Sequence, residues 1–243
     1  MLRRIIADEG DLSAGADGDL AHWRSVAAGV RGPVLEIGCG AGRILTALGI
    51  DERQLIGLDL DREALSLAGE RAPMAMWICA DGRDWRSVGT RAELVIVGGD
   101  LISVIPSADD LAAILRTAAI HLAPRGRVGI DATLMDPQLF SREVNGEWAI
   151  DLDRPDAIFT RVRRESRIFP DPEGRPNTVL LEIRHRTLDA DGVFVPLYPD
   201  RAPFAIRAWQ PDEVREIAVA AGLRLLSAGP DDRLRWLLRS ADE

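Results

Sequence analysis

The sequence predicts a doubly wound α/β fold, with a mostly parallel seven-stranded sheet and an antiparallel β insertion. In the first 140 of the 243 residues, short apolar runs alternate with segments of helical composition. Near-continuous apolar strands of this kind are typical of a parallel sheet that helices cover on both faces. Residues 137–210 instead alternate with a period of two and show no helix-length periodicity, which indicates antiparallel strands.

The predicted strands of the α/β part are short and apolar. They cover residues 33–38, 54–59, 74–79, 93–97 and 128–132, and helices are expected between them at 41–49, 62–70 and 109–122. In the last of these helices Leu111, Ile114, Leu115, Ala118 and Leu122 recur at helical spacing. A further helix begins at Pro211, and two strands at 223–228 and 234–239 follow it. The short turn between these two strands predicts that the last one is antiparallel.

The insertion is expected to form at least three strands, at 158–169, 179–187 and 193–197, separated by polar turns. We therefore assign 1–136 and 205–243 to one α/β domain, with an N-terminal helical segment at 1–30, and 137–204 to a β-rich insertion. The length of the chain fits one large domain that carries such an insertion.

Composition excludes several function classes. The chain carries 39 acidic and 30 basic residues, for a net charge of −9, which argues against a nucleic-acid partner. Every basic residue is Arg, so neither a lysine Schiff base nor a P-loop is available. Two Cys and three His argue against a metal site. No signal peptide or membrane span is recognisable, so we expect a cytoplasmic protein without a membrane partner.

A glycine-rich turn after the first strand is the sharpest motif. Gly38, Gly40 and Gly42 lie between this strand and the next helix, where backbone N–H groups can approach a ligand. The third glycine comes one place too early for the G-x-G-x-x-G pattern of dinucleotide-binding enzymes. Glu36 precedes the first glycine by two residues, and its charge would oppose a pyrophosphate but suits an ammonium and a sulfonium.

The pattern E-x-G-x-G-x-G resembles the first motif of the Rossmann-like (class I) S-adenosylmethionine-dependent methyltransferases. Further segments at family-like spacing extend the resemblance over about 30–135 and 205–240. They are Gly57-Leu-Asp-Leu-Asp61, Ala80-Asp-Gly-Arg83, Leu94-Val-Ile-Val-Gly-Gly-Asp100, Leu122-Ala-Pro-Arg-Gly-Arg-Val128 and Ala220-Ala-Gly-Leu-Arg-Leu225. Arg125 and Leu223 depart from the family pattern, which usually has a glycine and an aromatic residue there.

The resemblance implies S-adenosyl-L-methionine as cofactor and gives each motif a role. Glu36 would orient the methionyl ammonium, Asp59 would hold the ribose, and Asp81 with Arg83 would bracket the adenine. Trp23 would line the methionyl end, although packing of a helix explains it equally well. The implied cofactor-binding residues are Trp23, Glu36, Gly38, Cys39, Gly40, Gly42, Asp59, Leu60, Asp81, Gly82, Arg83 and Gly98.

The subclass rests mostly on missing motifs. Neither a [DN]-P-P-[YF] motif nor a nucleophilic Cys follows the fourth strand, and the layout resembles small-molecule O- or N-methyltransferases. Asp100 and His185 are the candidate catalytic residues, with a solvated loop acid and a core His as the alternatives. Tyr198 is a candidate pocket wall, and His121 is expected to be a cation at a helix end. No metal site is expected.

We expect the insertion to bind the small-molecule acceptor as a lid, and the protein to be a monomer or a homodimer. Two other functions stay open: a S-adenosylmethionine-binding regulatory or partner protein without transferase activity, and a peptide or protein methyltransferase.

Overall fold

The computed structural model describes residues 18–49, 53–138, 146–156, 159–197, 202–229 and 233–242. It divides into two compact units. The first takes in the described residues up to Ser103, Ser107–Leu134 and the chain from Trp209 onward. The second takes in Val104–Pro106 and Met135–Ala208. Each unit is described separately below.

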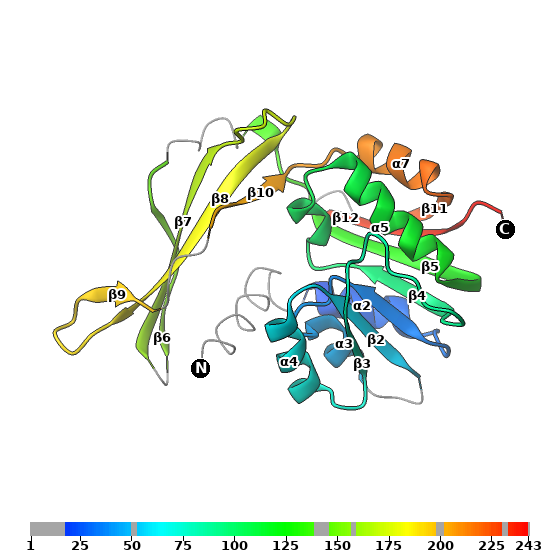
Figure 1. Cartoon of the computed structure of the whole chain (residues 1–243), viewed down its shortest axis with the longest axis horizontal. Helices are drawn as coiled ribbons and strands as arrows, with labels where there is room; N and C mark the ends of the chain where they lie inside the picture. The colour runs from blue at the N-terminus through cyan, green and yellow to red at the C-terminus, as the bar shows by residue number, and fades with distance from the viewer. Residues whose placement is uncertain are drawn as a thin grey trace. The chain divides into compact units, whose positions relative to one another are not determined.

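The first unit is built on a seven-stranded sheet with the order β11-β12-β5-β4-β1-β2-β3 (Figure 1). β1 to β5 are joined as parallel neighbours, whereas β12 is antiparallel to both β5 and β11. The predicted mostly parallel sheet with an antiparallel last strand is therefore confirmed. The strands are β1 (Val34–Ile37), β2 (Leu55–Asp59), β3 (Met76–Cys79), β4 (Ala92–Val97), β5 (Leu122–Thr133), β11 (Leu223–Ala228) and β12 (Arg233–Ser240).

Helices cover both faces of this sheet, as the apolar strands predict. On one side α2 (Gly18–Ala27), α3 (Arg43–Leu48) and α4 (Arg62–Arg71) contact one another in sequence. On the other, α5 (Ala108–Ile120) packs against α7 (Pro211–Ala220). A short 3-10 helix, η1 (Leu101–Val104), follows β4. The buried face of α5 consists of Leu111, Ile114, Leu115, Thr117 and Ala118, which includes four of the five residues expected from the spacing. The fifth, Leu122, is instead the first residue of β5, because α5 ends at Ile120.

β5 begins six residues earlier than the sequence suggests. The segment Pro124–Arg127, which we expected to separate α5 from the strand, is part of the strand itself. Arg125 adopts a left-handed φ of 62°, and the pairing with β4 shifts register between Ala92 and Leu94. The strand therefore carries an irregularity at this point. Proline and glycine are typical of loops, so this part of the strand is not recognisable from the sequence.

The second unit is an antiparallel sheet with the order β10-β8-β7-β6, and β9 pairs with β8. Its strands are β6 (Ala149–Asp156), β7 (Thr160–Pro170), β8 (Thr178–Leu188), β9 (Phe194–Pro196) and β10 (Phe204–Arg207). The sequence predicts β7, β8 and β9 but misses the edge strands β6 and β10. The first is rich in Asp and contains Pro, and the second has four residues, so neither shows a clear alternation.

The connections of the first sheet locate its ligand-binding edge. From β1 the chain proceeds to β2 and β3 on one side, and β4 and β5 then lie on the other side of β1. In open α/β sheets ligands bind beyond the carboxyl ends of the strands at such a switch point. We therefore expect a ligand-binding site at the carboxyl ends of β1 and β4.

Candidate functional site

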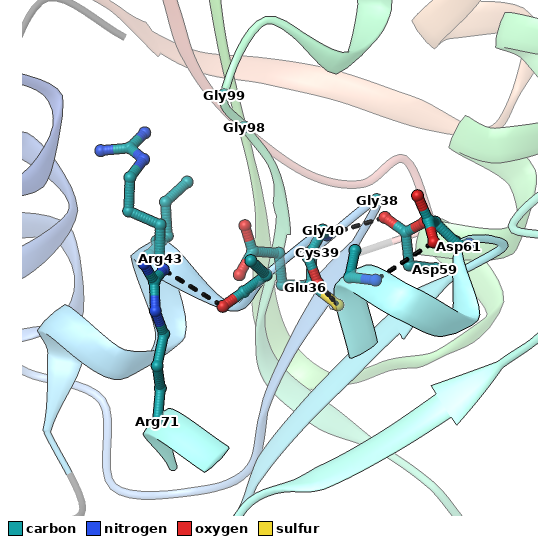
Figure 2. Close-up of a pocket in the computed structure, with 13 residues that line it drawn as sticks. Glu36, Gly38, Cys39, Gly40, Arg43, Asp59, Asp61, Arg71, Gly98 and Gly99 are labelled. Atoms are coloured by element: carbon teal, nitrogen blue, oxygen red, sulfur yellow. Dashed lines mark hydrogen bonds between the residues drawn. The ribbon is translucent and has the colours of Figure 1, made fainter. Parts of the chain in front are cut away.

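A cavity of about 330 Å³ opens where β1 and β4 end (Figure 2). Ligand sites are typically of this size or larger. The loop after β1, the end of β2, the start of α4 and the two glycines after β4 form its wall. The lining residues are Glu36, Gly38, Cys39, Gly40, Ala41, Arg43, Ile44, Asp59, Asp61, Ala64, Arg71, Gly98 and Gly99.

The three glycines of the turn adopt left-handed backbone conformations, with φ values of 74°, 50° and 74° at Gly38, Gly40 and Gly42. Their surroundings differ. A Cβ on Gly42 would lie 2.5 Å from the ring of Trp77, so this glycine allows the turn to pack on β3. A Cβ on Gly40 would meet nothing within 4 Å. Gly40 therefore leaves open space on the side of the turn that a ligand can approach.

Asp59 holds the turn from the end of β2. Its Oδ2 accepts the backbone N–H of Gly40 at 2.7 Å, and its Oδ1 accepts that of Asp61 at 2.8 Å (Figure 2). Asp61 caps α4 by accepting the N–H groups of Glu63 and Ala64. Because the neighbouring acid does the capping, the carboxylate of Asp59 keeps lone pairs for hydroxyl donors of a ligand.

Glu36 is the most unusual group in the cavity wall. It is 3% exposed, on a strand that is buried throughout, and its Oε2 has no hydrogen-bond partner among the described residues. Burial raises the pKa of Glu36 to about 8, against the opposing effect of the nearby Arg43. Arg43 itself is paired with Asp19 of α2. A buried oxygen without a partner is costly, so the site suits a ligand that brings a hydrogen-bond donor or a cation.

Residues 34–126 match the family model described as "Methyltransferase domain". No curated protein matches the chain in sequence. Among solved structures, an S-adenosylmethionine-dependent methyltransferase from Clostridium acetobutylicum superposes with a TM-score of 0.76 at 16% identity, over 99% of both chains.

Two further solved structures share the fold. The sugar N-methyltransferase KedS8 from Streptoalloteichus gives a TM-score of 0.70 at 19% identity, over 92% of this chain and 87% of that one. CalS10, an amino pentose methyltransferase from Micromonospora echinaspora solved with bound S-adenosylmethionine, gives 0.68 at 20% identity over 96% and 94%. Over residues 34–126 the chain is thus similar to methyltransferase domains.

The first unit places the expected cofactor residues other than Trp23 in two groups. Glu36, Gly38, Cys39, Gly40, Gly42, Asp59 and Gly98 surround or support the cavity. Cys39 is buried, and burial raises the pKa of its thiol, so it is no thiolate nucleophile. The other group, Leu60 and the segment from Asp81 to Arg83, does not line the cavity.

Asp81 and Arg83 bind each other after β3. The Nε and Nη2 atoms of Arg83 donate to both oxygens of Asp81, at 2.6–3.0 Å, and Nη1 donates to Asp110. These bonds lower the pKa of Asp81. A Cβ on Gly82 would lie 2.6 Å from the side chain of Ile37, so this glycine allows the turn to pack against the end of β1.

Trp23 lies in the core of the first unit. It is fully buried among residues such as Val34, Ile44 and Leu94, and its ring fills the space over Gly98 and Gly129. The structure therefore places it beneath the cavity and not on its wall, which agrees with the helix-packing alternative.

Asp100 follows the two glycines that end β4 and takes part in a network across three strands. It has a left-handed φ of 60°, and its Oδ1 accepts the N–H of Thr133. Arg233 of β12 contacts both its oxygens at 3.4 Å and binds the fully buried Asp131 at 2.8 Å. Asp100 is thus held in position as an ion-paired carboxylate, and no sequence motif points to Arg233.

The remaining candidates lie elsewhere. His185 is 2% exposed on β8 of the second unit, and Tyr198 lies outside the described residues. His121 was expected to be a cation, and this was wrong. It is buried and stacked on Trp85, its Nε2 accepts the N–H of Ser87, and burial lowers its pKa, so the ring is neutral.

The residues that the structure describes contain no group of three or more His, Cys, Asp or Glu that could hold a metal ion. No described helix is both long and apolar enough to cross a membrane.

Proposed function

We propose that this protein is an S-adenosylmethionine-dependent methyltransferase that acts on an oxygen or nitrogen of a small molecule. The observation that carries the proposal is the buried, unpartnered Oε2 of Glu36 beside an open glycine turn. S-adenosylmethionine presents an ammonium and a sulfonium at one end and ribose hydroxyls in the middle. These are the groups that a buried carboxyl and a held carboxylate can bind.

Residues in the cavity wall and one pair outside it then have defined tasks. Glu36 accepts a hydrogen bond from the ammonium, directly or through water, and its carboxylate form is stabilised by that positive charge. Asp59, already fixed by two backbone N–H groups, accepts from the ribose hydroxyls. Gly40 lets the ligand approach the backbone. Asp81 and Arg83 bind near the adenine as a preformed pair.

The bound cofactor supplies an electrophilic methyl group on sulfur. The chain must hold the acceptor atom in line with that methyl and keep water away, and such positioning provides much of the rate. Asp100 stands at the same sheet edge as Gly98 and Gly99, and its network with Arg233 fixes its orientation. We propose that it anchors the acceptor through a hydrogen bond, and takes up a proton where the acceptor starts protonated.

A small-molecule acceptor is the finer part of the proposal. Two of the structures with this fold are described as a sugar N-methyltransferase and an amino pentose methyltransferase. We extend this description to the present chain as a hydroxylated or amino-bearing small molecule. The second unit, with its buried positions at Val162, Val179 and His185, is proposed to contribute to the choice of acceptor.

Calorimetry on the full chain tests the cofactor. S-adenosylmethionine and its demethylated product should bind, and NAD should not. Asp59→Ala should weaken binding by about 1.5–3 kcal/mol, the scale of hydrogen bonds to a charged group. Asp84→Ala, which removes an exposed carboxylate outside the cavity wall, is the matched control. Tight binding of NAD without any response to S-adenosylmethionine would refute the assignment.

A paired measurement tests the role of the second unit. His185→Asn should change kcat/KM for the acceptor while the Kd of S-adenosylmethionine stays within about twofold of wild type. The melting temperature of the variant controls for loss of folding. If cofactor affinity falls as much as turnover does, the second unit does not serve the acceptor separately.

A further inference from the structure

A second, strongly basic cavity lies in the first unit. It measures about 490 Å³ and is lined by Pro124, Arg125, Arg127, Leu226 and Arg239. None of these residues lines the cavity at the glycine turn. Three arginines around one hollow are unexpected in a chain with a net charge of −9. The proposed methyl transfer uses none of them.

The strand register places arginines directly opposite one another in this region. Arg239 of β12 pairs with Arg224 of β11. On the other side of β12, Leu238 pairs with Val128, which brings Arg239, one residue further, opposite Arg127 of β5. Directly opposite residues of antiparallel strands project from the same face. Because like charges at such positions repel, this row of three arginines destabilises the sheet unless a negative charge lies among them.

At the other end of β12, a carboxylate of the chain itself neutralises the arginines. Arg233 and Arg235 alternate on the same face as Arg239. Both contact the buried carboxylate of Asp131, at 2.8 and 3.6 Å. The chain thus places an acid on β5 to neutralise two arginines of β12, but opposite the third it places another arginine.

Burial adds to the difference between Arg239 and the two neutralised arginines of β12. The Nε atom of Arg239 is buried, and it has no hydrogen-bond partner within the ranges that the structure describes. Arg127 acts electrostatically on Glu93, whose pKa is lowered first by backbone hydrogen bonds and less by this arginine. Its Oε2 accepts the backbone N–H groups of Arg31 and Gly32. The carboxylate of Glu93 is therefore already hydrogen-bonded to the backbone.

We propose that this cavity is a binding site for a small molecule with a phosphoryl group or another multiply charged anion. Guanidinium groups present paired N–H donors that match the oxygens of phosphate, and they stay charged at all relevant pH values. Arg127 and Arg239 supply two such groups from neighbouring strands, and Arg125 supplies a third from the irregular start of β5. The bound anion neutralises the row and gives the buried Nε a partner. This inference does not depend on the proposed methyl transfer.

Pyrophosphate is the probe for a direct test. Calorimetry on the full chain at about 150 mM salt, with and without S-adenosylhomocysteine, should show one pyrophosphate site that is unaffected by the cofactor product. Arg239→Gln should weaken pyrophosphate binding at least tenfold. Arg116→Gln, which removes the same charge from an exposed position on α5, should bind as wild type does. Equal pyrophosphate affinity in Arg239→Gln and wild type, or no binding by wild type, would overturn the proposal.

Further arms separate the possible ligands and failures. Sulfate, citrate and a nucleoside diphosphate distinguish an inorganic anion, a carboxylate and a phosphorylated metabolite by their relative affinities, and each must depend on Arg239. If Arg239→Gln does not fold, Arg127→Gln takes its place. Both variants should bind S-adenosylhomocysteine within about twofold of wild type. A loss of cofactor binding together with pyrophosphate binding would mean one common site, and would also overturn the inference.

Discussion

Replacing Glu36 by glutamine should stabilise the empty protein and weaken its hold on S-adenosylmethionine. The glutamine keeps the shape of the side chain but cannot ionise. Burial raises the pKa of Glu36 to about 8 from an ordinary value of 4.5. The folded protein therefore binds a proton that the unfolded chain releases between pH 4.5 and 8, and stability falls across this range as the pH rises.

The size of the effect follows from the pKa shift. One unit corresponds to about 1.4 kcal/mol, so the wild type should lose about that much unfolding free energy per pH unit between pH 5 and 8. At pH 7.5 the accumulated cost approaches about 4 kcal/mol, an upper bound because nearby groups relax. Glu36→Gln avoids this cost. In exchange it loses a charged partner for the ammonium, and the Kd should rise about ten- to hundredfold.

Urea denaturation of the cofactor-free protein at several pH values measures the first effect, and calorimetry with S-adenosylhomocysteine measures the second. Glu93→Gln is the matched control. Hydrogen bonds from the backbone N–H groups of Gly32 and Arg31 lower the pKa of Glu93, so its contribution is present above pH 4.5 and is lost on acidification. This control should destabilise the protein at pH 7 and leave cofactor binding unchanged.

The reasoning is refuted if Glu36→Gln keeps the pH slope of the wild type, or if it destabilises the empty protein at pH 8. A variant that binds the cofactor product as tightly as wild type would leave the burial argument intact. It would remove Glu36 from the binding site.

Three further predictions concern the same unit. Gly42→Ala should lower the melting temperature strongly, because the new Cβ would clash with Trp77 at a residue with a left-handed φ. Gly40→Ala should cost only about 1 kcal/mol of backbone strain and act mainly on cofactor affinity. Equal losses of stability in the two variants would contradict this. Asp100→Asn should lower kcat by about ten- to a thousandfold with little change in cofactor Kd, and unchanged turnover would exclude Asp100 from the acceptor site. Turnover should survive EDTA, and restoration of lost activity by Mg²⁺ would show that a metal takes part.

The cofactor side of the site could be foreseen because its parts follow one another along the chain. A buried strand, a glycine turn and an acid at the end of the next strand are local signals, and the sheet brings their ends together. The cavity accordingly contains Glu36, Gly40 and Asp59. Arg43 and Arg71 also line it, but an arginine at a helix start or end carries no such signal.

Other features depend on pairing between distant segments and have no local signature. Asp100 meets Arg233 across 133 residues, and only the insertion of β12 beside β5 brings them together. The same holds for His121, which we expected to be a cation because it lies at the end of a helix. Its neutral state follows from burial, which brings it against Trp85 and against the N–H of Ser87, 34 residues away. The first half of β5 was also not predicted, because its irregular pairing with β4 has no local signature in the sequence.

The place of β12 in the sheet also governs the order in which the protein can assemble. β5 ends at Thr133, and its neighbour begins a hundred residues later, at Arg233. During synthesis β1 to β5 can pair, and the second unit can fold, while one side of β5 still lacks a partner. Such an open edge invites pairing with other chains until the last strand arrives.

The long sequence separation also implies a slow closing step, since distant contacts form late. The buried Asp131 stays without Arg233 until then. A chain that lacks its last strand should therefore aggregate through β5 even though all the residues of the cofactor cavity are present.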